Sequence, residues 1–282
     1  MRTKIFGKDG PPVPAIGQGT WDIPESGPRL DEAKRAIRRG IELGMVHLDT
    51  AEMYGSGRVE ELLGEAIAGI AREKLFIGSK VLPGNADYKG TIAACDRSLA
   101  RMRLEYLDLY MLHWPSSEPL EETMRALEAL VKAGKTRYVG VSNFDVDELA
   151  QARSYLRTEK LACNQILYHL KERSIEFRLQ PYCEREGIAI VAYTPFGRGR
   201  FPREGAGANG VLGKIAAKHH GTPRQVILNF LIRQSNVFTI PKASSVAHVE
   251  ENAAADAFTL DDSDVAAIDR AFPAHDGPLA SL

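Results

Sequence analysis

Cysteine is scarce in this sequence, and its few thiols are not spaced for metal or redox chemistry. The three cysteines among 282 residues are Cys95, Cys163 and Cys183, and no two of them form a CxxC pair. An odd number of widely separated cysteines argues against a disulfide framework. We therefore expect buried free thiols in a protein of a reducing compartment, the cytoplasm.

An excess of charge of one sign is also absent, as is any hydrophobic run of membrane-spanning length. The 36 Lys and Arg residues nearly balance the 37 Asp and Glu residues, which leaves a formal net charge of −1. This balance argues against a broad nucleic-acid or anionic-membrane footprint. No apolar run approaches the roughly 20 residues of a transmembrane helix, and the first ten residues lack the apolar core of a signal peptide. We expect a monomer that acts on a small molecule, with neither nucleic acid nor membrane as partner.

The sequence instead alternates short apolar runs with amphipathic segments. Strands are predicted at residues 15–18, 45–48, 75–78, 107–112, 138–141, 162–167, 188–193 and 237–240, after a hairpin formed by 3–6 and 13–16. Helices are predicted at 31–43, 59–70, 90–102, 120–132, 146–156, 176–185, 211–219, 223–233, a segment ending near 255, and 262–271. Helix-start signals are Asp31 as a cap, Asp145 with Glu148 as a capping box, and Thr222 followed by Pro223 and Gln225.

Strands that are apolar on both faces and separated by helices are typical of a parallel sheet buried on both sides. Eight such strands in a chain of 282 residues fit a closed barrel of eight βα units. We predict an α/β fold with one domain over residues 1–282. It is a (β/α)8 TIM barrel with an N-terminal β-hairpin and a helix appended after the last barrel helix. An open, doubly wound sheet is the alternative.

A polar side chain of a chemically useful type stands at the end of almost every predicted strand. These residues are Asp49, Lys80, His113, Ser142 with Asn143, Gln165, Tyr193 and Lys242. In a parallel barrel the carboxyl ends of the strands meet at one rim, where active sites of this architecture are built. The spacing therefore predicts an active site at this rim.

Four residues form a plausible proton-delivering group. A phenol with a pKa near 10 is a weak acid at neutral pH, so Tyr54 needs a neighbouring ammonium such as Lys80 to lower that value. Asp49 would keep Lys80 charged, and His113 could hold a carbonyl oxygen by a hydrogen bond. The structural alternative is that Asp49 caps a helix, Tyr54 covers a loop and His113 is a satisfied rim histidine.

Two other kinds of site fit the sequence poorly. A metal site from His47, Asp49 and His113 would have to tolerate Lys80, whose ammonium competes with a cation, so we expect no metal. The stretch 205–210 matches G-x-G-x-x-G, but no clear strand leads into it and no acidic residue follows about 20 positions on. We expect a flexible loop there rather than a Rossmann phosphate site.

The motifs resemble those of the aldo-keto reductases over essentially the whole chain. They are GQGTW at 17–21, HLDTAEMYG at 47–55, GSK at 78–80, LHWP at 112–115, GVSNF at 140–144, NQI at 164–166, YTPF at 193–196 and IPKASSVAHVEEN at 240–252. The short loops and short tail look most like small bacterial members, including those that reduce methylglyoxal and related 2-oxoaldehydes.

The resemblance implies NADPH bound across the barrel rim, with Tyr54 as the general acid of a catalytic tetrad completed by Asp49, Lys80 and His113. It implies Ser142, Asn143 and Gln165 on the nicotinamide carboxamide and Tyr193 stacked on the ring. The adenosine end would contact Lys242, Ser244, Ser245, Glu251 and Asn252. The remaining expected cofactor contacts are Gly19, Thr20, Thr194, Phe196 and His248. Substrate walls would come from Trp21, His113 and Trp114, with Met53 as a further candidate.

One position departs from the family pattern. His248 stands where many relatives have an arginine against the 2′-phosphate, and histidine carries at most part of a charge at neutral pH. Ser244 and Ser245 open a helix N-terminus that suits a phosphate, with Lys242 adding charge. We therefore expect NADPH to be preferred and NADH to be possible.

The activity that the resemblance implies is reduction of aldehydes or ketones to alcohols. The expected substrates are small 2-oxoaldehydes such as methylglyoxal, or aromatic aldehydes. Because the sequence ends at Leu282, soon after the last predicted helix, we expect little material for a C-terminal lid and an open, weakly selective pocket. The alternative function is a cofactor-binding, redox-sensing regulatory subunit of the same fold.

Overall fold

The eight predicted strands form one parallel sheet that closes into a barrel. The computed structural model describes residues 1–199, 201 and 208–280. Neighbours in the sheet follow chain order: β3 (Gln18–Gly19), β4 (His47–Asp49), β5 (Phe76–Val81), β6 (Leu107–Leu112), β7 (Thr136–Ser142), β8 (Leu161–Leu167), β9 (Ala189–Tyr193) and β10 (Val237–Thr239). Parallel bridges from Ile16 to Thr239 and from Gly19 to Lys242 join the first strand to the last. The predicted barrel is therefore confirmed, and the open sheet is not formed.

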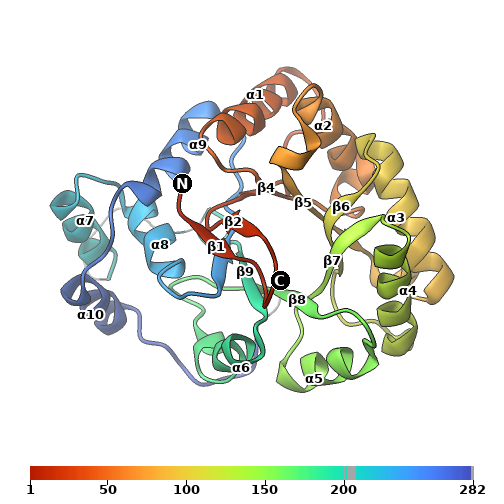
Figure 1. Cartoon of the computed structure of the whole chain (residues 1–282). Helices are drawn as coiled ribbons and strands as arrows, with labels where there is room; N and C mark the ends of the chain where they lie inside the picture. Colours follow the sequence, from red (N-terminus) through yellow and green to blue (C-terminus); the bar gives the residue numbers. More distant parts are fainter. Residues whose placement is uncertain (200, 202–207, 281–282) are drawn as a thin grey trace.

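Helices surround this sheet (Figure 1). The ring consists of α1 (Pro28–Glu42), α2 (Arg58–Ile67), α3 (Tyr88–Met102), α4 (Leu120–Lys132), α5 (Val146–Tyr155), α6 (Leu179–Glu186), α8 (Pro223–Leu231) and α9 (Val246–Ala253). Two more helices, α7 (Ala208–Lys218) and α10 (Asp262–Ala271), lie outside the ring, where α7 packs on α8 and α10 packs on α7. The predicted appended helix is α10.

The N-terminal hairpin lies across one end of the barrel (Figure 1). Its strands, β1 (Thr3–Ile5) and β2 (Pro12–Pro14), pair antiparallel as predicted. Phe6, between them, is fully buried with its ring centroid 4.8 Å from that of Phe76 and 5.1 Å from that of Phe238. These aromatic rings fill this end of the barrel, so the site must lie at the other end.

The strands are apolar on both faces because each face packs against a different layer. In β6, Leu109 and Met111 belong to the interior cluster that contains Phe6, whereas Tyr110 and Leu112 pack into the larger cluster formed with the helices. Alternate residues of a strand point to opposite faces, so a strand between two apolar layers has no polar face. A polar side chain inside this barrel therefore needs a specific partner.

The first helix begins earlier than predicted, and Asp31 is not its cap. α1 starts at Pro28 with Gly27 at the N-cap position. Proline suits the first turn because its missing N–H would have no helical partner there. Asp31 lies inside the first turn, where its carboxylate is near the positive end of the helix dipole. The two predicted capping boxes are confirmed, Asp145 with Glu148 on α5 and Thr222 with Gln225 on α8.

Several other predicted boundaries are wrong; for example, the helix predicted at 59–70 ends at Ile67, and the strand predicted at 75–78 continues to Val81. The helix predicted at 176–185 begins only at Leu179, because Ser174–Glu176 forms a separate 3-10 turn. The strand predicted at 15–18 contributes only Gln18 to β3, which continues to Gly19. Residues 205–207 of the expected flexible loop lie outside the described residues. Residues 208–210 belong to α7, so the loop expected there is wrong and the helix begins three residues earlier than predicted.

The cysteines are buried and unpaired, as predicted. Cys95, Cys163 and Cys183 are free thiols, and burial raises the pKa of the Cys95 thiol to about 12. A protonated, inaccessible thiol is a poor nucleophile and a poor metal ligand. Within the described ranges, no helix has the length and apolar character needed to cross a membrane.

Candidate active site

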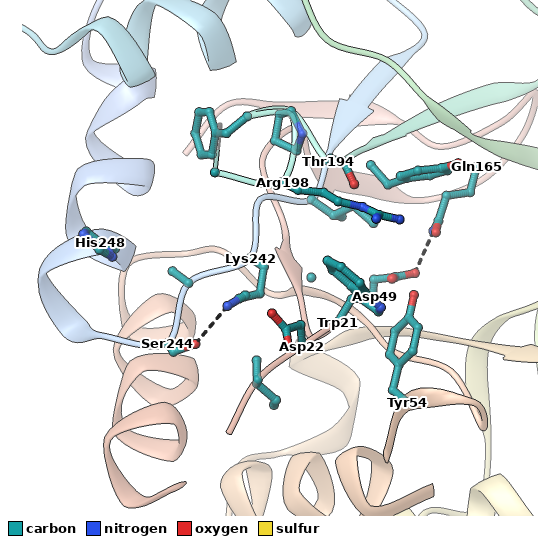
Figure 2. Close-up of a pocket in the computed structure, with 18 of the residues that line it drawn as sticks. Trp21, Asp22, Asp49, Tyr54, Gln165, Thr194, Arg198, Lys242, Ser244 and His248 are labelled. Atoms are coloured by element: carbon teal, nitrogen blue, oxygen red, sulfur yellow. Dashed lines mark hydrogen bonds between the residues drawn. The ribbon is translucent and has the colours of Figure 1, made fainter. Parts of the chain in front are cut away.

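A cleft of about 790 Å³ opens at the carboxyl ends of the strands, and most of the predicted site residues line it. Figure 2 shows Tyr54, Asp49 and Gln165 at one end of the view and Lys242, Ser244 and His248 at the other. The predicted residues that line the cleft are Gly19, Trp21, Asp49, Tyr54, His113, Trp114, Ser142, Asn143, Gln165, Tyr193, Thr194, Phe196, Lys242, Ser244, Ser245 and His248. Met53 also lines it. The strand ends therefore converge as the spacing predicted.

Lys80 does not line the cleft, but it contacts two other members of the predicted tetrad, Asp49 and Tyr54. Its side chain is fully buried, and its Nζ donates to Asp49 Oδ2 at 2.7 Å and to the Thr50 carbonyl at 2.7 Å. The same ammonium lies 3.3 Å from Tyr54 Oη. Tyr54 stands in a 3-10 turn, η1 (Tyr54–Gly57), directly after the loop that follows β4. The predicted group is thus assembled from β4, η1 and β5.

The protonation states follow from burial and from this contact. Burial opposes the charge on Lys80, but Asp49 and Tyr54 together raise its pKa above the usual value. Lys80 is therefore charged, as predicted. Burial raises the pKa of Tyr54, and the lowering effect of Lys80 does not overcome it. The prediction that Lys80 brings the phenol below its ordinary pKa is wrong for the protein alone, because the phenolate would be formed in a desolvated site.

His113 is a neutral imidazole beside the phenol. Its ring centroid lies 5.7 Å from that of Tyr54 in an edge-on arrangement. Burial, followed by repulsion from Lys80, lowers the pKa of His113 to about 2. Its buried Nδ1 has no hydrogen-bond partner among the described residues. A neutral imidazole at the cleft can hydrogen-bond a substrate oxygen without adding a charge to the site.

A hydrogen-bonded set of polar side chains continues from Asp49 around the rim. Gln165 Nε2 donates to Asp49 Oδ1 at 2.7 Å, and Tyr193 Oη donates to Asn143 Oδ1 at 2.7 Å. Asn143 Nδ2 donates to the His113 carbonyl at 3.1 Å and to Ser142 Oγ at 3.1 Å. These bonds fix the orientations of groups that face the cleft, and Tyr193 leaves an aromatic surface there.

The opposite end of the cleft is formed by the start of α9. Ser245 is the N-cap residue, its Oγ accepting from the His248 backbone N–H at 3.4 Å. Lys242 Nζ donates to Ser244 Oγ at 3.4 Å (Figure 2). A helix N-terminus with an adjacent ammonium is a favourable place for a phosphate group.

Three predicted cofactor residues do not line the cleft. Thr20 is buried, and its Oγ1 donates to the Asp49 carbonyl at 2.9 Å, so it holds the end of β4 in place. Glu251 accepts from Thr222 Oγ1 at 2.8 Å, which ties α9 to the start of α8. Asn252 is buried on α9. Their motif positions are as expected, but none of the three side chains reaches this cavity.

Several charged residues line the cleft without having been predicted from the sequence. They are Asp22, Arg29, Glu32, Arg198 and Arg224. Arg198 belongs to the Gly/Arg-rich stretch after β9, but the sequence does not indicate which of its arginines points inward. Asp22 lies in a loop, and Arg29, Glu32 and Arg224 lie near the start of a helix, where amphipathic spacing gives little indication of side-chain direction.

His47 faces the barrel interior, away from the cleft. Its ring centroid is 5.3 Å from that of Phe76 and 6.0 Å from that of Phe6, and burial lowers its pKa to about 3. Within the described part of the chain, no group of three His, Cys, Asp or Glu residues could hold a metal ion. His47 is therefore a core histidine that packs against the aromatic rings of Phe6 and Phe76.

Comparison with known proteins agrees with this geometry. The model of the aldo/keto reductase family matches residues 15–272. The methylglyoxal reductase YeaE of Escherichia coli is 42% identical over 95% of this chain and 94% of its own length, and a glyoxal reductase of Bacillus subtilis is 37% identical over 93% and 90%. An aldo/keto reductase from Klebsiella pneumoniae, solved in complex with NADP and acetate, superposes with a TM-score of 0.93 at 37% identity, covering 100% of both chains. The chain therefore belongs to the aldo/keto reductase family.

Proposed function

We propose that this enzyme reduces aldehydes and ketones to alcohols with NADPH, using Tyr54 as the general acid. The observation that carries the proposal is the buried chain of contacts from Asp49 through Lys80 to the Tyr54 hydroxyl, with Nζ 2.7 Å from the carboxylate and 3.3 Å from the phenol oxygen. A core lysine fully removed from solvent needs such a partner set to remain charged. Two relatives are named as a methylglyoxal reductase and a glyoxal reductase. Both names denote reduction of a carbonyl group, which supports the same assignment.

The cleft residues fit a dinucleotide of this kind. Tyr193 offers an aromatic surface at one end, with the amides of Asn143 and Gln165 beside it. Lys242 and the N-terminus of α9 offer positive charge at the other end. The Klebsiella relatives were solved with NADP and with NADPH. When bound, NADPH supplies a hydride to the carbonyl carbon.

The chain's own residues supply the proton. As the C=O bond becomes C–O, its oxygen gains negative charge and takes the proton from Tyr54 Oη. The Lys80 ammonium stabilises the phenolate left behind, and Asp49 holds that ammonium in place. The neutral His113 hydrogen-bonds the same oxygen and orients it toward Tyr54. General acid catalysis by a correctly positioned side chain typically raises the reaction rate by about two to four orders of magnitude.

The substrates that fit best are small 2-oxoaldehydes such as methylglyoxal, and aromatic aldehydes. Trp21, Met53 and Trp114 line the cleft and are 37–40% exposed, so they present apolar walls at its mouth. Exposed aromatic side chains at a cleft favour flat, apolar parts of a ligand over charged ones.

A spectrophotometric assay tests the proposal. Methylglyoxal and 4-nitrobenzaldehyde are added to the protein with NADPH, and cofactor oxidation is followed by absorbance at about 340 nm. Continuous turnover, at the roughly 1–1000 per second common for enzymes, is expected with at least one of the two. Oxidation of a single equivalent of NADPH per protein would instead favour the regulatory-subunit alternative, and no oxidation with a wider aldehyde panel would contradict the proposal.

The pH profile of reduction should lack a histidine inflection. Since the pKa of His113 is lowered to about 2 and that of Tyr54 is raised, both groups keep the required protonation state as the pH rises through the neutral range. The turnover number at saturating NADPH should therefore be flat around the ordinary histidine pKa of about 6.5 and fall only under alkaline conditions. An inflection near neutral pH that disappears in His113→Asn would contradict a neutral His113.

Lys242 is expected to distinguish the two cofactors. NADH lacks the 2′-phosphate, so loss of a cation that pairs with this group should weaken NADPH binding alone. Lys242→Ala should raise the NADPH dissociation constant about tenfold more than the NADH constant, measured by fluorescence titration. Lys214→Ala, an exposed change on α7, is the matched control. Equal effects on both cofactors would show that Lys242 does not read the 2′-phosphate.

A further inference from the structure

A buried carboxylate lies two residues before Tyr54 and has no part in the proton-transfer group. Glu52 belongs to the motif at 47–55, yet its side chain is only 4% exposed and does not line the cleft. A carboxylate removed from water is costly unless hydrogen bonds or an opposite charge compensate for the lost hydration. The groups that compensate Glu52 therefore show which parts of the fold it connects.

One oxygen of Glu52 holds the segment that follows β5. Oε1 accepts from the Leu82 backbone N–H at 2.8 Å and from Asn85 Nδ2 at 2.9 Å. Oε2 accepts from Arg97 Nη2 at 3.2 Å. The Arg97 side chain is 46% exposed, so water can solvate its guanidinium if this pair is broken. The two bonds to Oε1 are therefore the main connection.

These bonds join the chain segments that carry three members of the predicted tetrad. Glu52 comes two residues before Tyr54, and Leu82 comes two residues after Lys80. The Glu52 backbone N–H also donates to the Lys80 carbonyl, but at 3.3 Å. The His113 backbone N–H donates at 3.0 Å to the carbonyl of the residue before Leu82. The Glu52 side chain thus ties the loop of the acid to the strand end that carries the ammonium and supports the imidazole.

The contact between the acid and the ammonium is sensitive to the position of this loop. Lys80 Nζ lies 3.3 Å from Tyr54 Oη, which is longer than usual for a hydrogen bond, whereas it lies 2.7 Å from Asp49 Oδ2. After Tyr54, Gly55 and Ser56 have φ of 54° and 51°, so the turn lacks the continuous hydrogen bonds of a regular helix. Contacts made before Tyr54 therefore matter more for its position.

We propose that Glu52 is a positioning residue, which holds the Tyr54 hydroxyl beside Lys80 through its bonds to Leu82 and Asn85. This inference rests on the proposed function, because it assigns Glu52 a part in delivering the Tyr54 proton. A displacement of about 1 Å in a reacting group can lower a rate about a hundredfold. Loss of the Glu52 bonds should therefore slow proton transfer without removing any group that lines the cleft.

Three substitutions separate the contributions of the two Glu52 oxygens. Glu52→Met keeps the length of the side chain and removes all three bonds. Glu52→Gln keeps an oxygen that can accept from Leu82 and Asn85, and it loses only the ion pair with Arg97. Asn85→Ala removes one of the two donors to Oε1.

Asp108→Asn is the matched control, because Asp108 makes the same kinds of bond at the other end of β5. Its buried carboxylate accepts from the Ile77 backbone N–H at 2.9 Å and from Arg72 Nη2 at 2.7 Å. Urea denaturation gives the stability of each variant. Turnover is measured with NADPH and methylglyoxal or 4-nitrobenzaldehyde, whichever the unmodified protein reduces faster. It is expressed per NADPH-binding site, so that unfolded protein does not lower the value.

Glu52→Met is expected to lower the turnover number per site by about tenfold to a hundredfold. The Michaelis constant for the aldehyde and the dissociation constant for NADPH should stay within about twofold of their original values. The ratio of turnover in H₂O to turnover in D₂O should rise, because proton transfer becomes rate-limiting. Glu52→Gln should stay within about threefold of the original turnover, and Asn85→Ala should lie between the two. Asp108→Asn should lose stability but keep both the turnover per site and the isotope ratio.

Unchanged turnover per site in Glu52→Met would overturn the proposal, as would unchanged turnover in Asn85→Ala if Glu52→Met does not fold. An equal loss in Glu52→Gln would assign the effect to the charge rather than to the bonds of Oε1. An equal loss in Asp108→Asn would show a general response to a weakened fold, and either result would overturn the positioning role. Failure of the unmodified protein to oxidise NADPH with either aldehyde would instead contradict the proposed function itself.

Discussion

Tyr54→Phe is expected to lower the turnover number for aldehyde reduction by about two to four decades. The change removes one oxygen atom, the only atom through which this side chain contacts Lys80 by a hydrogen bond. The ring itself is 9% exposed and packs in the core, so phenylalanine fills the same space. The loss should therefore appear in turnover while the dissociation constant for NADPH stays near its original value. Single-turnover kinetics with NADPH and methylglyoxal give the measurement.

A second tyrosine variant separates loss of the acid from loss of a hydroxyl in general. Tyr155→Phe removes a phenol at the end of α5 that accepts a hydrogen bond from Gln151 Nε2 at 3.3 Å and does not line the cleft. It should leave turnover unchanged. Near-normal turnover by Tyr54→Phe would remove Tyr54 from the acid role, and the pocket would then need another proton donor.

Lys80→Met is expected to destabilise the fold and to abolish most of the activity. Methionine matches much of the lysine volume, but among the described residues it leaves Gln165 as the one side-chain partner of the buried Asp49 carboxylate. Breaking a buried ion pair on one side costs about 3–5 kcal/mol because the remaining charge is uncompensated. Urea denaturation of the variant should show this loss in the free energy of unfolding. Turnover should fall as well, because the phenolate of Tyr54 loses its neighbouring cation.

The double variant Asp49→Asn with Lys80→Met distinguishes the structural effect from the catalytic one. Removing both charges leaves no uncompensated ion, so most of the lost stability should return. Turnover should remain as low as in Lys80→Met, since no ammonium faces Tyr54. Recovery of turnover together with stability would show that Lys80 serves only the fold.

The large-scale architecture was predictable because it depends on the repeated local pattern. β6 and α4 begin and end at the predicted residues, because a doubly apolar run and an amphipathic run of standard length leave little freedom. Capping boxes fixed the starts of α5 and α8, because each box consists of hydrogen bonds between two residues three positions apart in the sequence. Where the local signal was weaker, as at Asp31 and at residues 176–178, the predicted boundary was wrong.

The pKa of Tyr54 could not be inferred from residue types. Pairing a phenol with a lysine suggests a lowered value, but the balance depends on how far both groups are removed from water. Burial of Tyr54 outweighs the attraction of Lys80, and the nearby Asp49 also favours the neutral phenol. The same burial makes His113 neutral.

By itself, the sequence determined the barrel, the rim at which the strands end, and the grouping of Asp49, Tyr54, Lys80 and His113 for which we propose proton transfer. Each of these depends on the type of a residue and on its position along a strand or directly after one, which are local properties. Only the tertiary structure decided that Arg198 and Arg224 enter the cleft, and that Thr20, Glu251 and Asn252 do not. A loop or a first helical turn carries no periodicity that gives its side chains a direction. That direction comes from contacts between elements far apart in the chain, such as Arg198 on Trp21 and Arg224 on Phe196.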